Sequence, residues 1–139
     1  MIVKWAGVEV GDNLPPLTAG PITRTTLALY AGGSGDHTPY HIDTDYAHRA
    51  GYDDVFAHGM LSMAYLGRLL TQWVDQRQIR AFNARFLALT HVHDEIMCSG
   101  QVVEKIREAG EGRVRLTLAA TTKAGVQTLS GTAEVALPD

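Results

Sequence analysis

The apolar residues near the carboxyl end of the chain recur at every second position, which is the repeat of a β-strand. In residues 113–123, Val114, Leu116 and Leu118 alternate with polar or smaller neighbours, and residues 128–138 repeat this alternation. One face of each segment is therefore expected to be buried. Two half-buried strands are predicted here.

Two preceding segments, 79–92 and 95–106, also have the character of strands. Glycine-containing turns at 108–112 and 123–125 separate the last three predicted strands and are short enough to form hairpins. The carboxy-terminal half is therefore predicted to be an antiparallel meander.

Residues 59–74 have a different pattern, with apolar side chains on nearly every side of a helical repeat. Such a helix is expected to be enclosed by other elements, so we predict an α+β fold in which an antiparallel sheet wraps around it. No repeat, low-complexity run or charged linker divides residues 1–139, which indicates a single domain. Pairing two copies edge to edge would cover the open sheet edges, which predicts a dimer.

Two shorter helices are expected before the central one. Thr23 is a candidate cap for a helix that ends at the glycines of residues 31–35. Residues 44–51 suggest a second helix, with Thr44 as a possible cap and Gly51 as its stop.

Composition excludes several classes of protein. The formal net charge of -3 provides no broad basic field, so neither nucleic acid nor a membrane is an expected partner. Cys98 is the only cysteine, which excludes an internal disulfide and a cysteine-cluster zinc site; it is expected to be a small buried filler. The first residues lack the apolar run of a signal peptide, and we expect a cytoplasmic protein.

Candidate chemistry is concentrated in residues 34–43, SGDHTPYHID. Pro39 fixes its own backbone angle and favours an extended Thr38, so the segment is expected to bend in a defined way. That bend can aim Asp36 and His41 into one cleft. A carboxylate and an imidazole offer a base and a proton donor near neutral pH, which suits the addition or removal of water.

Two other interpretations of these residues stay open. Asp36 and His41 can belong to a polar surface turn without chemistry. Histidines can also bind a metal: His37 and His41 are four residues apart, and His91 and His93 are two apart. An exposed pair is the simpler interpretation of the last two.

Residues 57–62, AHGMLS, form the second informative stretch. A loop that leads into a glycine at the start of a buried helix presents free backbone N–H groups, which can polarise a carbonyl. Gly59 permits close approach. Ser62 can bond a reacting group or cap the helix, and the cap is the simpler role; His58 is expected to be structural more often than catalytic.

Together, SGDHTPYHID and the downstream FAHGMLSM resemble the MaoC-like family of (R)-specific enoyl thioester hydratases and dehydratases. The layout is similar to small 3-hydroxyacyl-carrier-protein dehydratases of bacterial type II fatty-acid synthesis. The resemblance implies a hot-dog fold, in which a long helix is wrapped by an antiparallel sheet and two domains pair. It also implies a hydro-lyase that adds water reversibly to trans-2-enoyl thioesters or dehydrates (3R)-hydroxyacyl thioesters.

By position, the resemblance assigns the catalytic dyad to Asp36 and His41, carbonyl polarisation to the Gly59 N–H, and a supporting role to Ser62. The residues predicted to contact the substrate are Thr38, His58, Met60 and Arg85. No metal or redox cofactor is implied. The expected partners are a coenzyme A or acyl-carrier-protein thioester and a second hot-dog subunit, identical or different. A non-catalytic subunit that binds the acyl chain for a catalytic partner is the alternative.

Two positions depart from the family pattern. The residue before Pro39 is Thr38 where the family has asparagine, so support for the dyad is expected to differ. A later Pro-Val pair of the family is replaced by Thr90 and His91, which predicts a reshaped turn after that strand.

Overall fold

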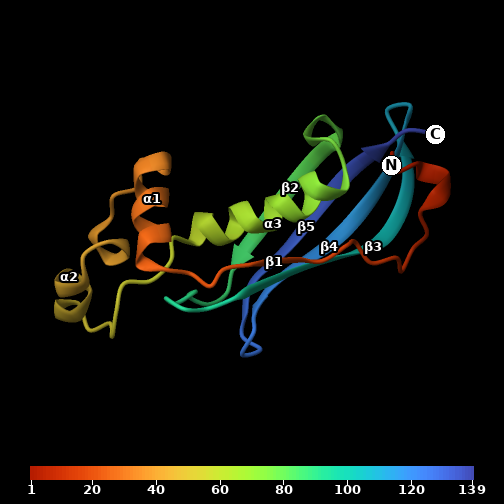
Figure 1. Ribbon diagram of the computed structural model, residues 1–139. Coiled ribbons are helices and arrows are strands. Elements are labelled where there is room, and N and C mark those ends of the chain that lie inside the picture. The colour runs from red at the N-terminus through yellow and green to blue at the C-terminus, as the bar shows by residue number, and fades with distance from the viewer.

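The computed structural model describes residues 1–139 and places five strands beside one long helix (Figure 1). The helices and strands, in chain order, are η1 (Trp5–Gly7), β1 (Leu17–Ala19), α1 (Arg24–Ser34), η2 (Pro39–His41), α2 (Thr44–Arg49), α3 (Gly59–Trp73), η3 (Gln76–Gln78), β2 (Ile79–Phe86), β3 (Ile96–Glu108), β4 (Glu111–Thr122) and β5 (Gln127–Leu137). The elements labelled η are short 3₁₀ helices.

The sheet has the order β1-β3-β4-β5-β2, and every neighbouring pair is antiparallel. Strands β3, β4 and β5 form the predicted meander. Strand β2 does not continue it, because β2 lies against β5 on the far side from β3. Strands β1 and β2 are thus the two edges of the sheet.

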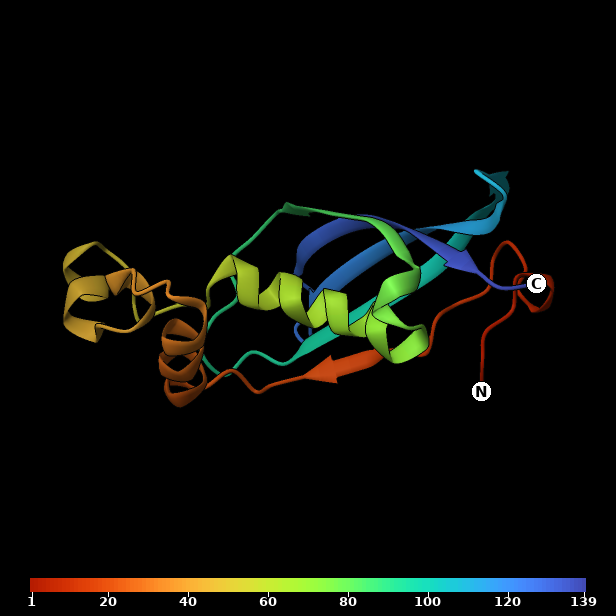
Figure 2. The same cartoon turned by 90° about the horizontal axis from the view of Figure 1, so that it is seen from above.

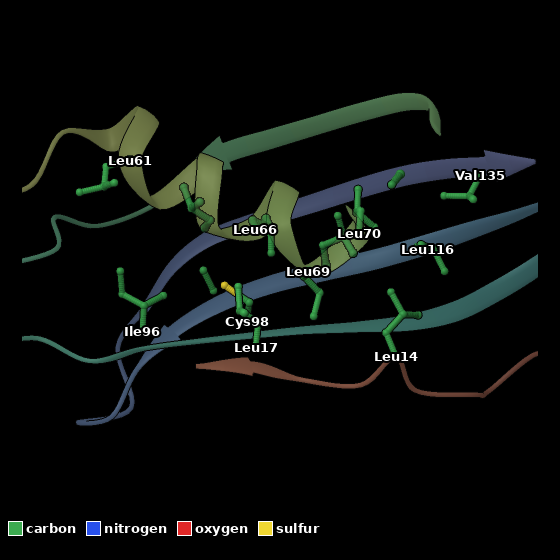
Figure 3. Close-up of a cluster of buried hydrophobic side chains, with 14 of the residues drawn as sticks. Leu14, Leu17, Leu61, Leu66, Leu69, Leu70, Ile96, Cys98, Leu116 and Val135 are labelled. Atoms are coloured by element: carbon green, nitrogen blue, oxygen red, sulfur yellow. The ribbon is translucent and has the colours of Figure 1, made fainter. Parts of the chain in front are cut away.

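Helix α3 lies along one face of the sheet, as Figure 2 shows from above. Its leucines at positions 61, 66, 69 and 70 are buried, and they meet strand side chains in the apolar cluster of Figure 3. Gly100 of β3 lies beneath them, and a β-carbon there would lie 3.0 Å from a methyl group of Leu118 and 3.4 Å from one of Leu69. The central helix and the α+β class are confirmed.

The two shorter helices lie together beyond the amino-terminal end of α3 (Figures 1 and 2). The Thr23 side chain accepts from the Thr26 N–H and begins α1, which ends at Gly35 with a φ of 79°. The predicted cap of α2 was one residue late. Asp43 accepts from the Tyr46 N–H, and Thr44 is already the first helical residue.

Strand β2 ends at Phe86, so the prediction of a strand through residue 92 was wrong at its carboxyl end. The pairing of β2 with β5 stops at Phe86 and Leu129. Beyond it, the N–H groups of Leu87 and Ala88 both donate to the Thr128 carbonyl, and the chain leaves the sheet. This departure allows the following residues to line a cavity.

The prediction for Cys98 is confirmed, since the side chain is 1% exposed within the core. Burial disfavours the thiolate and raises the pKa of this thiol to about 11. No helix of the chain has both the length and the apolarity needed to cross a bilayer.

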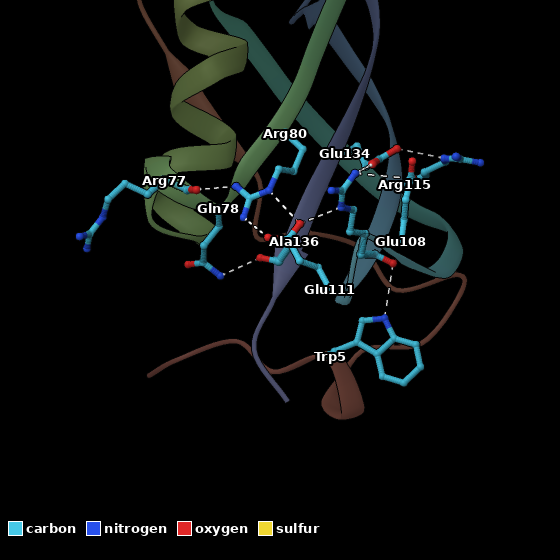
Figure 4. Close-up of polar contacts among 10 residues, drawn as sticks. Trp5, Arg77, Gln78, Arg80, Glu108, Glu111, Arg115, Glu134 and Ala136 are labelled. Atoms are coloured by element: carbon cyan, nitrogen blue, oxygen red, sulfur yellow. Dashed lines mark hydrogen bonds and ion pairs between the residues drawn. The ribbon is translucent and has the colours of Figure 1, made fainter.

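A network of ion pairs covers the outer side of the sheet near the β3–β4 turn (Figure 4). The Glu111 carboxylate accepts from the Nε of Arg80 and from the Nε of Arg113, both at 2.9 Å. Arg113 also donates to Glu134 at 2.7 Å. These bonds stabilise the charged carboxylate, chiefly through the hydrogen bond from Arg80, and lower the Glu111 pKa from 4.5 to about 2.

This network predicts a specific loss of stability in acid. Because the Glu111 pKa is lowered by folding, its contribution is present above about pH 4.5 and disappears as the pH falls toward 2. The urea midpoint of the wild-type protein is therefore expected to fall more steeply over this range than that of Glu111→Gln. Asp45→Asn, at an exposed position without an ion pair, is the control. If the urea midpoints of the wild type and Glu111→Gln fell equally with pH, the stabilising role of the Glu111 carboxylate would be contradicted.

Candidate active site

The turn between α1 and η2 fixes Asp36 through hydrogen bonds close in sequence. The Asp36 N–H donates to the Ser34 hydroxyl at 3.1 Å. Carboxylate oxygen Oδ1 accepts from the Thr38 N–H at 3.1 Å and from the Thr38 hydroxyl at 2.6 Å. The predicted bend before Pro39 is therefore built around the aspartate itself.

These bonds favour the charged form of Asp36. The hydroxyl of Thr38, followed by its N–H, lowers the pKa of the carboxyl group. The side chain is exposed in the chain. At neutral pH Asp36 is consequently a carboxylate, able to accept a proton or hold a water molecule.

The ring of His41 is held in one orientation. Its Nδ1 lies 2.7 Å from the Phe56 carbonyl oxygen, and the Phe56 ring contacts it edge-on at a centroid distance of 5.1 Å. A carbonyl oxygen only accepts, so Nδ1 carries a proton and donates it to this bond. In the neutral ring the lone pair is therefore on Nε2, which can accept a proton.

His58 lies behind His41 and is 1% exposed. The two rings stack with centroids 4.0 Å apart, and Tyr30 contacts the other side of His58 at 4.8 Å. The Nε2 of His58 donates to the Asp36 backbone carbonyl at 3.0 Å, whereas Nδ1 is buried without a partner. Burial is the main cause of its lowered pKa, so His58 is neutral and acts as a structural link between Asp36 and α3.

The predicted dyad is thus assembled together with one additional histidine. One donor atom each from Asp36, His41 and His58 lies within 4.8 Å of the other two. The metal interpretation had combined His41 with His37, His91 and His93, and the structure does not gather those four. His91 and His93 are an exposed pair, as the simpler interpretation had it.

A cavity of about 430 Å³ opens beside His41. Its wall is mostly apolar, and the lining residues are His41, Phe56, Ala57, Gly59, Ser62, Phe86, Leu87, Ala88, Leu89, Thr90, Thr128 and Leu129. Asp36 lies next to this wall without being part of it. Three of the four predicted catalytic residues therefore border one cavity, with the fourth at its margin.

The amino terminus of α3 faces this cavity through Gly59. His58 is the N-cap and makes no side-chain capping bond, so the first N–H groups of the helix are not capped by that side chain. A β-carbon on Gly59 would lie 2.9 Å from the Phe86 ring. Only glycine fits here without displacing Phe86, and the backbone of Gly59 remains accessible to a ligand.

Ser62 is not the cap of α3, and that part of the prediction was wrong. It lies one turn inside the helix and shares a 3.2 Å hydrogen bond with the Thr90 hydroxyl, both side chains being buried. The Thr90 carbonyl in turn accepts from the Ala57 N–H at 2.9 Å. The segment after β2 thus places a polar pair in the cavity wall.

The other predicted contacts differ in position. Thr38 and His58 contact Asp36 and do not line the cavity. Met60 is 55% exposed and does not line the cavity. Arg85 is exposed beside a second, more polar hollow that shares Leu87 with the cavity.

Two supporting residues had not been identified from the sequence. Phe56 orients His41 through its backbone carbonyl, and no pattern of side chains in the sequence predicts that contact. The sequence marks Thr90 only as a departure from the family motif, and its pairing with Ser62 joins residues 28 positions apart.

Comparison with known proteins identifies the family. The family model described as MaoC like domain matches residues 9–124. The 3-hydroxyacyl-thioester dehydratase Z of Mycobacterium tuberculosis is 28% identical over 108 residues, which cover 73% of this chain and 71% of that protein.

Solved structures agree with this match. The unliganded R-hydratase PhaJ1 from Pseudomonas aeruginosa has a TM-score of 0.87 at 28% identity and covers 99% of this chain and 87% of its own. The (R)-hydratase of A. caviae involved in PHA biosynthesis, at a TM-score of 0.79 and 24% identity, covers 94% of this chain and 98% of its own, and shows the same fold. The hot-dog fold is thereby confirmed, and this chain belongs to the MaoC-like domain family, whose relatives named above are hydratases and dehydratases.

Proposed function

We propose that this protein is a hydro-lyase that interconverts trans-2-enoyl and (3R)-hydroxyacyl thioesters. The observation that carries the proposal is the meeting of Asp36 and His41 at the margin of an apolar cavity that also contains the amino terminus of α3. The names of the dehydratase and hydratase relatives support the same reaction.

The cavity wall suits the electronic demand of this reaction. When water adds to the β-carbon of an enoyl thioester, negative charge develops on the thioester oxygen. A backbone N–H at the start of a helix stabilises such charge. We assign this role to Gly59, where the absence of a side chain leaves the backbone open. The acyl chain would lie along the apolar residues of the wall.

The dyad supplies the two proton transfers. In hydration, an O–H bond of water breaks as its oxygen bonds to the β-carbon, and the α-carbon gains a proton; dehydration reverses both steps. The Asp36 carboxylate and His41 Nε2 are both free to accept a proton, and the protonated partner returns one. The groups form a coupled pair, so the two transfers are assigned to the dyad as a unit.

The carrier portion of the substrate would extend outside the cavity. Arg85 lies beside the neighbouring hollow and makes no ion pair, so its guanidinium can meet the phosphate of a coenzyme A or carrier-protein arm. Met60 lies exposed at the start of α3, where it can contact the same arm. Ser62 would support the bound thioester through its buried hydroxyl.

We also propose that the protein acts in the cytoplasm as a single-domain chain paired with a second hot-dog subunit. Strand β2 is an edge of the sheet, and most of its residues are exposed. Pairing there would cover its free backbone groups. Asp36, exposed in one chain, is a position that a second subunit can help to enclose.

The test is an assay of the purified chain with trans-2-butenoyl and trans-2-octenoyl coenzyme A, in which hydration removes the absorbance of the conjugated enoyl group. We expect hydration to the (3R) product, and sedimentation should give twice the mass of one chain. Absence of activity from the folded protein, alone and with candidate partner subunits, would refute the enzymatic proposal. A folded chain that binds the thioester without converting it would instead favour the acyl-binding alternative.

A further inference from the structure

The two oxygens of the Asp36 carboxylate are in different situations. Oδ1 accepts both the N–H and the hydroxyl of Thr38, at 3.1 and 2.6 Å. No protein group bonds to Oδ2. The backbone on either side is also held, because the Asp36 N–H bonds to Ser34 and its carbonyl accepts from His58. Rotation of the carboxylate would break two bonds to Thr38.

From this arrangement we propose that Thr38 is a positioning residue that holds the Asp36 carboxylate in one orientation and leaves Oδ2 as its single reactive oxygen. The inference rests on the proposed hydro-lyase function. Thr38 does not exchange a proton with the substrate in this scheme. Its hydroxyl proton stays in the bond to Oδ1, while Oδ2 receives or returns the proton that moves in the reaction.

The chemistry of threonine at this position supports the assignment. A hydroxyl gives a short O–H···O⁻ bond, which is stronger than a bond between neutral groups. Thr38 is followed by Pro39, which favours an extended Thr38, and in this conformation the N–H and the hydroxyl of Thr38 reach the same oxygen. The family motif has asparagine here, so the hydroxyl bond to this carboxylate is a feature of the present chain.

Other titratable groups near Asp36 come from three different elements. Tyr30 faces it from α1, His41 from η2 and His58 from the start of α3. Tyr30 has a raised pKa and His58 a lowered one, so both are neutral near pH 7. The largest influence on the Asp36 pKa is the hydrogen bond from the Thr38 side chain. Removing that hydroxyl is therefore expected to raise this pKa.

The test compares Thr38→Val, which keeps the shape and loses the hydroxyl, with Thr38→Ser, which keeps the hydroxyl. For Thr38→Val we expect kcat/KM to fall roughly tenfold, because a hydrogen bond to a charged group is lost. The acid limb of its pH profile should move to higher pH. Thr38→Ser should restore both the rate and the limb. If Thr38 only maintained the fold of the turn, Thr38→Val would lower kcat/KM without moving the acid limb of the pH profile.

A second measurement does not depend on activity. The ¹³Cγ resonance of Asp36, followed through a pH titration, reports the pKa of this carboxyl in each variant. We expect a higher pKa in Thr38→Val and the wild-type value in Thr38→Ser, with circular dichroism showing that all three proteins are folded. An unchanged pKa in Thr38→Val would overturn the inference even in an active enzyme. A raised pKa in a protein that hydrates no thioester would support the positioning of Asp36 and refute the proposed function.

Discussion

Asp36→Asn is expected to lower kcat/KM for enoyl thioester hydration by about 10²–10⁴-fold, which is the usual contribution of a positioned acid or base. The amide keeps the size of the side chain but cannot accept a proton at the reacting position. Asp36 is exposed, so the substitution should leave the fold intact. Thioester affinity should also change little, since the side chain does not line the cavity.

The matched control is Asp45→Asn, the same exchange at an exposed position on α2 outside the site. His41→Ala should cause a loss similar to that of Asp36→Asn, and the double variant should be little worse than either, because residues that act as a unit are not additive. Steady-state kinetics, thioester binding and circular dichroism would be measured for these four variants and for the wild type. Wild-type kcat/KM in folded Asp36→Asn would refute the dyad.

Leu66→Ala is expected to lower the free energy of unfolding by about 2–5 kcal/mol, the range for truncating a buried leucine. Leu66 is 0% exposed on the face of α3 that meets the sheet. One of its methyl groups lies 3.4 Å from where a β-carbon on Gly131 would be, so the helix and β5 are closely packed here. The cavity left by alanine would remain partly unfilled.

Urea denaturation at one fixed protein concentration provides the measurement, since subunit association would change apparent stability. The control is Leu29→Ala, the same truncation at a position of α1 that is 72% exposed. Its unfolding free energy should change by less than about 0.5 kcal/mol. Equal losses for the two variants would contradict the assigned core.

Much of the fold was predictable because its signals are local. The period of the apolar residues located α3 and strands β3 to β5, and the cap and glycine signals located α1. The errors occurred where two elements meet. The end of β2 depends on where its pairing with β5 stops, and the cap of α2 depends on which of two adjacent polar residues bends the chain.

The contacts of the site can likewise be separated into local ones, which the sequence indicates, and long-range ones, which it does not. The Asp36 and Thr38 contacts span two residues, so the motif around Pro39 already contained them. The contact of His41 with Phe56 spans 15 residues, and that of His58 with Asp36 spans 22. Contacts at that separation leave no local pattern, because they depend on the path that the intervening chain takes.

The sequence by itself determined the α+β class, the central helix and the family resemblance, and it supplied the residues of the proposed dyad, since each rests on local periodicity or on a short motif. Only the tertiary structure decided that His58 is a buried link, that Ser62 pairs with Thr90, and that the segment after β2 lines a cavity. The physical reason is that burial and long-range hydrogen bonds arise when distant segments pack together, and packing determines which polar atoms still lack a partner.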